Sequence, residues 1–164
     1  MTTELYKISR WFIGVLLTVG TSFLVGVIFI LPQEMSFFKV SDIFLFVVSL
    51  VISLTFAIYG IYLFQMRRQG RHFYWDDEGI VVDLKGNKVY WHEIESISLS
   101  NYQGRKATLI YLHYTHHESI RVRFQKMWGT TAYSIDWFFI ERGKAYHKGL
   151  MKRWEEQQKK KHFS

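Results

Sequence analysis

Two long stretches without charged side chains constrain this 164-residue chain more than any other feature. Neither residues 11–33 nor residues 43–66 contain an Asp, Glu, Lys, Arg or His. About 20 apolar residues in a helix cross the hydrocarbon core of a bilayer, and both stretches reach that length. The sequence therefore predicts a transmembrane hairpin over residues 11–66, with spans at about residues 11–32 and 43–66.

The alternative reading of the first stretch is a cleaved signal peptide. Its apolar run is about twice as long as a usual signal core, no small-residue cleavage pattern follows it, and a second span comes next. We therefore expect both spans to be retained. The lack of ionisable side chains within them argues against a proton relay, an ion path or a substrate site inside the bilayer.

Positive charges beside the spans predict the topology. The cations on the terminal sides are Lys7, Arg10, Arg67, Arg68 and Arg71. The connecting segment, residues 34–42, offers Lys39 alone, next to two acidic residues. By the positive-inside rule, both termini are predicted to be cytoplasmic in a multi-pass protein of the plasma membrane, with residues 1–10 as an N-terminal tail.

Residues 67–164 are predicted to form a cytoplasmic domain. They carry 18 Lys or Arg and 11 Asp or Glu, and therefore the whole net charge of +7. The absence of Cys agrees with a reducing compartment. Alternating apolar residues and turn signals predict strands at residues 80–84, 88–91, 95–99, 107–114 and 119–125, with a tight turn at residues 85–87 and a turn or bulge before Ile97.

A C-terminal amphipathic helix is predicted over residues 134–158. Ser134 is the expected N-cap and Asp136 lies in the expected first turn. An apolar stripe follows helical spacing: Phe139, Gly143, Tyr146, Leu150 and Trp154. Gly143 marks a point where this helix could break.

Two segments resemble the bacterial pleckstrin-homology-like domains. Residues 77–81 read Asp-Glu-Gly-Ile-Val, and residues 89–97 read Val-Tyr-Trp-His-Glu-Ile-Glu-Ser-Ile, which is similar to the family's "Gly-Ile" strand followed by Trp-x-x-Ile-x-x-Ile. The resemblance covers residues 73 to about 158. It implies an α+β protein with a partly open antiparallel β-barrel capped by a C-terminal helix, behind N-terminal spans. The pattern predicts five or six strands, whereas the family's fold has seven, so the resemblance also implies a seventh strand, expected near residues 126–132. It implies no single activity.

The basic surplus suggests contact with anionic lipid. A cation near an anionic leaflet gains about 1 kcal/mol. The candidate headgroup contacts are Arg67, Arg68 and Arg71 beside the membrane exit, and Arg121 and Arg123 on a strand face; the latter two, with Arg105 and Lys106 on a turn, could add a second basic patch. The first three could instead serve only to set the topology. Trp137 and Phe138 are candidates for a surface that meets a protein partner, a second copy or the membrane; the alternative is that the start of the helix is buried all round.

Other chemistries have little support in the sequence. The histidines His92, His113, His116 and His117 invite a metal interpretation, but zinc usually takes Cys or carboxylate help and the chain has no Cys. Motifs for nucleophilic, phosphate-binding or metalloprotease chemistry are absent, and Asp76, Asp77 and Glu78 read as a solvated turn. We expect no cofactor and no catalysis. Nucleic-acid binding is disfavoured because the aromatic residues fit core positions.

Three functions follow as hypotheses. The first is a non-enzymatic, membrane-anchored module that binds a protein partner, self-associates or scaffolds an assembly on the cytoplasmic leaflet. The second is a protective membrane protein, of the immunity or envelope-stress type. The third is a sensor of anionic lipid.

Overall fold

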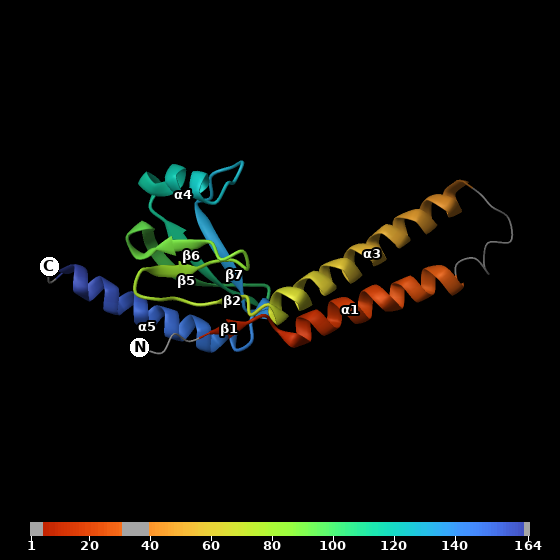
Figure 1. Ribbon diagram of the computed structural model, residues 1–164, viewed down its shortest axis with the longest axis horizontal. Coiled ribbons are helices and arrows are strands. Elements are labelled where there is room, and N and C mark those ends of the chain that lie inside the picture. The colour runs from red at the N-terminus through yellow and green to blue at the C-terminus, as the bar shows by residue number, and fades with distance from the viewer. Residues whose placement is uncertain (1–4, 31–39, 163–164) are drawn as a thin grey trace. The chain divides into compact units, whose positions relative to one another are not determined.

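The chain is α+β and forms two compact units. The computed structural model describes residues 5–30 and 40–162. One unit, called the helix pair below, contains Arg10–Gln69; the other, called the domain, contains the residues up to Ser9 and from Gly70 onward (Figure 1). The segment before the helix pair is therefore part of the domain and not a separate tail, because strand β1 (Tyr6–Lys7) pairs antiparallel with strand β2 (His72–Phe73).

The helix pair consists of two long apolar helices. Helix α1 (Arg10–Val25) continues as a short π-helix, η1 (Gly26–Ile30), and helix α3 covers Val40–Arg68. Both are long and apolar enough to cross a membrane, as the two predicted spans require. Residues 31–39, which include most of the predicted connecting segment and its Lys39, lie outside the described residues.

Small residues bring α1 and α3 close together. A Cβ atom on Gly20 would lie 2.8 Å from the backbone nitrogen of Ala57, and one on Gly60 would lie 2.8 Å from a methyl carbon of Leu17. Real Cβ atoms are essentially never found this close to other heavy atoms. Each helix therefore contributes one glycine to the contact, which relies on van der Waals packing as helix contacts in lipid generally do.

The domain contains three small antiparallel sheets. The pair β1–β2 is the first, and β3 (Gly79–Val81) with β4 (Lys88–Tyr90) is the second. The third consists of β5 (Ile94–Tyr102), β6 (Arg105–Leu112) and β7 (Ala132–Asp136), in that order. Most predicted strands are thereby confirmed, with shifted ends.

Both predicted irregularities are also confirmed. The Asp83 carboxylate accepts hydrogen bonds at 3.0 Å from the backbone N–H groups of Lys85 and Asn87, which closes the turn between β3 and β4. Between β4 and β5 the chain makes a 3₁₀ turn, η2 (Trp91–Glu93), and the β5–β6 register shifts between Ile94 and Ser96.

The predicted strand at residues 119–125 is wrong. After the 3₁₀ turn η3 (Tyr114–His116), residues His117–Arg123 form helix α4. Ile120 and Phe124 are buried and Val122 is exposed, so the burial follows helical spacing and not alternation. Ile120 and Phe124 are four residues apart, which is also one turn of a helix, so a short alternating run does not distinguish a strand from a helix.

The predicted start of the C-terminal helix is also wrong. Ser134 lies in β7, opposite Leu109, and the buried Tyr133 and Ile135 on either side of it alternate as a strand requires. Helix α5 covers Gly143–His162, after the 3₁₀ turn η4 (Trp137–Phe139). Strand β7 begins at Ala132, the last residue of the window in which the seventh strand was expected.

Helix α5 completes the core of the domain. Tyr146, Leu150 and Trp154 are buried, which confirms this part of the apolar stripe, whereas Phe139 is partly exposed and precedes the helix. The three buried residues of the helix belong to the same hydrophobic cluster as Ile80 and Ile110. The helix is therefore held to the sheets by burial of apolar area.

Candidate functional site

The two points at which the chain leaves and re-enters the domain lie at one end of it. The helix pair is inserted between Ser9 and Gly70, and the pairing of β1 with β2 brings these ends together. The N–H of Ser9 donates to the carbonyl oxygen of Phe139 at 2.9 Å, and the carbonyl of Lys7 accepts from the N–H of Glu141 at 2.9 Å. Turn η4 and the residues after it are thus fixed beside the chain exits.

The two neighbouring aromatic side chains at the start of turn η4 differ in exposure. A carboxylate oxygen of Asp136 accepts a hydrogen bond of 2.9 Å from the N–H of Phe138, which caps the turn. The Phe138 side chain is 59% exposed. Trp137 is partly buried, and its indole N–H donates to the Thr108 hydroxyl oxygen at 3.0 Å. Of the two residues predicted as a partner surface, the structure presents Phe138 to the outside.

A buried polar network holds η4 in place. Thr108 is fully buried, and its hydroxyl oxygen lies 3.1 Å from His147 Nδ1. Because the indole can only donate, the hydroxyl accepts from Trp137 and its own proton is available to the imidazole. Burial lowers the pKa of His147, which favours the neutral ring that can accept this proton. The network joins α5, β6 and η4.

The turn between β5 and β6 lies next to η4. Ala107 pairs with Asp136 at the end of β7, so Lys106 and Arg105, which pair with β5, extend beyond the last residue of β6 that pairs with β7. Both cations are exposed, and neither forms an ion pair with a residue that the structure describes. The ammonium nitrogen of Lys106 lies 5.9 Å from the centroid of the Trp137 ring, which fits a cation–π contact. Tyr102, in the same turn, is 71% exposed.

We call this part of the domain the anchor end. It consists of residues 7–9, residues 70–72, the β5–β6 turn (residues 102–106) and η4. Arg71, Arg105, Lys106 and Phe138 are candidates from the sequence, whereas Tyr102 and the exposure of Phe139 were not predicted. An aromatic residue next to the Gln-Gly turn was the available signal for Tyr102. For Phe139 no signal was available, because its place in the apolar stripe suggested burial.

The structure separates the residues of the second predicted basic patch, because Arg105 and Lys106 begin β6 whereas Arg121 and Arg123 follow its other end. Arg67 and Arg68 lie in the last turn of α3, where cations complement the helix dipole. Arg71 belongs to the anchor end, and one guanidinium nitrogen donates to the Lys85 carbonyl at 3.4 Å. Arg121 and Arg123 follow the far end of β6, whose eight residues extend roughly 23 Å from the β5–β6 turn.

The two arginines of α4 are engaged within the domain. Arg121 forms an ion pair with Glu118 on the same helix. Arg123 donates to both carboxylate oxygens of Glu93, at 2.8 and 2.6 Å, and stacks over the Tyr90 ring at 4.7 Å. Burial raises the pKa of Glu93, but the hydrogen bonds from Arg123 and from the Tyr90 N–H outweigh it and lower the pKa overall.

The acidic triplet is a turn whose side chains are paired with cations from other elements. The Lys88 ammonium bonds Asp76 at 2.6 Å and Glu78 at 3.0 Å. Asp77 pairs with Arg153, which is buried on α5. The hydrogen bond that Lys88 donates to the Asp76 carboxylate is the largest contribution to the raised pKa of Lys88. This turn therefore attaches both β4 and α5 to the loop before β3.

The histidines considered as metal ligands, His92, His113, His116 and His117, lie near the end of β6 that is far from the anchor end. The His92 and His116 rings meet edge to face at 5.4 Å between centroids, and a ring nitrogen of His117 lies 3.1 Å from the Leu112 carbonyl oxygen. Within the described residues, no group of three or more His, Asp or Glu is placed to hold a metal ion.

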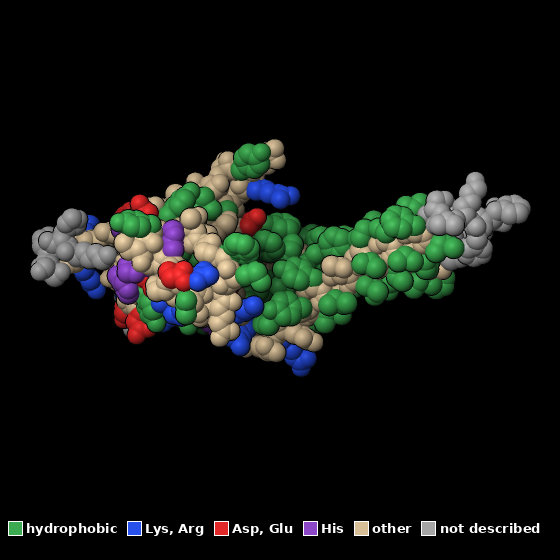
Figure 2. Space-filling model, turned by 90° about the horizontal axis from the view of Figure 1, so that it is seen from above, with side chains coloured by type: hydrophobic (Ala, Val, Ile, Leu, Met, Phe, Trp, Pro, Cys, Tyr) green, Lys and Arg blue, Asp and Glu red, His purple; other side chains and the backbone are tan. Residues whose placement is uncertain are grey.

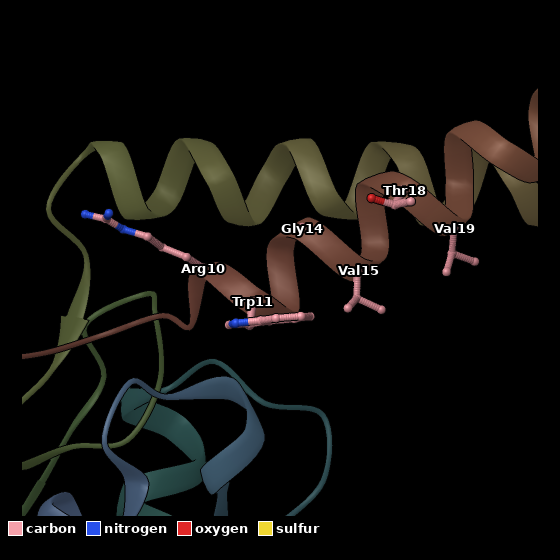
Figure 3. A pocket seen from close by; sticks show the side chains of 6 residues that line it. All are labelled: Arg10, Trp11, Gly14, Val15, Thr18 and Val19. Atoms are coloured by element: carbon pink, nitrogen blue, oxygen red, sulfur yellow. The ribbon is translucent and has the colours of Figure 1, made fainter.

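A shallow groove follows one face of α1 in the helix pair. It has a volume of about 520 Å³, and Figure 3 shows the side chains that line it: Arg10, Trp11, Gly14, Val15, Thr18 and Val19. Trp11, Val15 and Val19 project from the same side of the helix, and Gly14 leaves open space between them. Arg10 is the one titratable side chain in this lining, so the groove offers apolar contact and no catalytic chemistry.

Comparison with known proteins finds no matching family model, no matching curated protein and no matching solved structure.

Proposed function

We propose that the chain is an integral protein of the plasma membrane whose helix pair anchors a non-enzymatic interaction module to the cytoplasmic leaflet. The observation that carries this proposal is the insertion of two long apolar helices between the paired strands β1 and β2. A segment that leaves a domain and returns to it on adjacent strands places both flanking segments on the same side of the membrane.

The surface of the helix pair supports insertion into lipid. Figure 2 shows hydrophobic side chains along the surface of the helix pair. Among the exposed large apolar residues of the two helices are Phe29, Phe44 and Ile58. Soluble monomers rarely expose continuous apolar patches of more than a few hundred Å². In a bilayer the same side chains meet lipid tails, and the backbone polar groups are satisfied within each helix.

The charges at the ends of the helices support the orientation. Arg10 begins α1, and Arg67 and Arg68 end α3. These three cations lie next to the domain, so the positive-inside rule favours a cytoplasmic domain and cytoplasmic termini.

The domain is proposed to act as a pleckstrin-homology-like module. Small antiparallel sheets followed by a helix that buries Tyr146, Leu150 and Trp154 agree with the architecture that the sequence resemblance implies. The exposed Tyr114 and Trp128 offer contact area to a protein partner or to a second copy of the chain. This supports an interaction or scaffolding role.

Labelling of single cysteines tests the anchor and its orientation. The chain has no Cys, so Ser36→Cys and Thr115→Cys each create one unique thiol. We expect the protein to stay in the membrane after an alkaline carbonate wash. An impermeant maleimide should label position 36 in intact cells and position 115 only after lysis. Release by carbonate would refute the anchor, and the reverse labelling pattern would refute the orientation.

A photo-crosslinking amino acid at Trp128 tests the interaction role. We expect a discrete adduct in intact cells, either with one protein or with a second copy of the chain. The same amino acid at the lipid-facing position Phe44 is the control and should give no such adduct. A further variant carries the same amino acid at Tyr114. If neither position 128 nor position 114 gave a protein adduct, the proposed interaction role would be contradicted.

A further inference from the structure

We propose that the anchor end of the domain lies on the headgroups of the bilayer that holds the helix pair, with Tyr102 and Phe138 in the interface and Arg105 and Lys106 on anionic lipid. This inference rests on the proposed membrane anchor. It names the lipid surface as the occupant of the anchor end.

Chain continuity carries the first step. Ser9 directly precedes Arg10, the first residue of α1, and its N–H is bonded to the Phe139 carbonyl at 2.9 Å. On the other side, β2 begins only four residues after Arg68, the last residue of α3. With α1 and α3 in a bilayer, linkers this short hold η4 close to the membrane surface, whatever the tilt of the domain.

The composition of the anchor end carries the second step. Phe138 and Tyr102 are both exposed. Tyr is enriched at the level of the headgroups, and Phe is among the residues that interfacial segments bury at the boundary of headgroups and acyl chains. The hydrogen-bonded capping of η4 and the Thr108 network fix Phe138 as an outward-pointing residue. An ordered, exposed aromatic side chain loses little conformational entropy when it enters the interface.

Charge carries the third step. The exposed cations of the anchor end are Lys7, Arg71, Arg105 and Lys106, and its neighbouring acids are Asp136 and Glu141. The Asp136 carboxylate accepts a hydrogen bond from the Phe138 N–H, so its negative charge is partly compensated within the turn. The net positive charge complements an anionic leaflet, and each cation near such a surface favours docking by roughly fivefold.

The α4 end of the domain gives an internal contrast. Arg121 and Arg123 are already paired with Glu118 and Glu93, and they follow the end of β6 that is far from the exits. The docking surface is therefore the β5–β6 turn with η4, and not the arginines on α4 that the sequence analysis grouped with this turn.

The test uses the full-length protein in vesicles. Asn101→Cys, beside the β5–β6 turn, and Thr115→Cys, beyond the far end of β6, each carry an environment-sensitive fluorophore. Vesicles contain phosphatidylcholine with or without phosphatidylglycerol, and a trace of lipid with a nitroxide on its headgroup as quencher. We expect strong quenching at position 101 and little at position 115. Quenching at position 101 should be greater with phosphatidylglycerol and weaker at high salt.

Charge reversal provides the matched control. Arg105→Glu with Lys106→Glu should lower the docked-to-undocked ratio by at least roughly 25-fold. Lys159→Glu with Lys160→Glu makes the same change of net charge near the C-terminal end of α5 and should leave the quenching unchanged. A second pair of variants leaves the charge of the turn unchanged. Phe138→Ser should reduce the quenching, and Trp128→Ser, at an even more exposed aromatic residue outside the anchor end, should not.

Two results would overturn the inference. One is equal quenching at positions 101 and 115, and the other is an equal response to the two charge reversals. Both results are measured only on protein that floats with the vesicles, so neither would contradict the proposed membrane anchor. Protein that fails to float would instead refute the proposed function.

Discussion

Arg123 on α4 donates to both carboxylate oxygens of Glu93, at 2.8 and 2.6 Å, and the Glu93 side chain is only 3% exposed. The same carboxylate accepts the Tyr90 N–H at 2.9 Å. Three donors therefore compensate the burial of one negative charge, and they connect α4 to the turn that leads into β5. The pair thus joins the last residue of α4 to the turn η2.

Loss of Arg123 should destabilise the domain more than loss of Arg121. Arg123→Ala leaves the Glu93 charge buried without its main partner, and we expect a loss of about 2 kcal/mol in the free energy of unfolding, since the arginine itself is partly exposed. Arg121→Ala, which removes a surface pair with Glu118, should cost less than about 1 kcal/mol. Urea unfolding of the detergent-solubilised protein, followed by tryptophan fluorescence, measures both values. Equal losses would contradict the role given to Glu93.

Alanine substitutions at two glycines of α1 should have opposite effects. A Cβ on Gly20 would lie 2.8 Å from the Ala57 nitrogen, so Gly20→Ala should push α1 and α3 apart. No atom lies within 4 Å of a Cβ on Gly14, so Gly14→Ala should be neutral or add up to about 1 kcal/mol through helix propensity. The midpoint of thermal unfolding in one detergent, followed by circular dichroism, compares the variants. Changes of the same sign would argue against close helix packing at Gly20.

The stability of the domain should depend on pH through His147. The pKa of His147 in the folded domain lies below its ordinary value of 6.5. As the pH falls through 6.5, the unfolded chain therefore takes up a proton before the folded domain does, and the free energy of unfolding decreases. The contribution is complete above this range. His147→Gln should show a shallower loss of stability between neutral and mildly acidic pH, measured by urea unfolding at a series of pH values. An unchanged slope would exclude this histidine as the cause.

A Cβ at Gly143 should disturb η4. It would lie 2.5 Å from the Cβ of Trp137, so Gly143→Ala must shift either the start of α5 or the indole that bonds Thr108. We expect a loss of about 1–3 kcal/mol in the free energy of unfolding. Gly129→Ala, at a position with open space, is the control and should have little effect. If both variants unfold alike, the contact between Trp137 and the start of α5 is unimportant for stability.

Periodicity and charge determined the parts of the fold that are local. The two uncharged stretches identify α1 and α3, because the length of an apolar run is visible in the sequence itself. The turn at residues 85–87 follows from the chemistry of Asp83 and Gly86, and the burial of Tyr146, Leu150 and Trp154 follows from helical spacing. Each of these depends on residues within one element.

The remaining features depend on partners far away in the sequence, and only the tertiary structure decided them. Residues 119–125 fit a strand by alternation but form a helix, because Arg123 reaches Glu93, 30 residues earlier, and Phe124 enters the core. Ser134 fits an N-cap but pairs with Leu109. The anchor end is likewise an assembly of residues 7–9, 70–72, 102–106 and 137–139. The local sequence sets the propensity of each segment for helix, strand or turn. Segments so widely separated come together only through strand pairing and backbone hydrogen bonds, and no local pattern predicts these contacts.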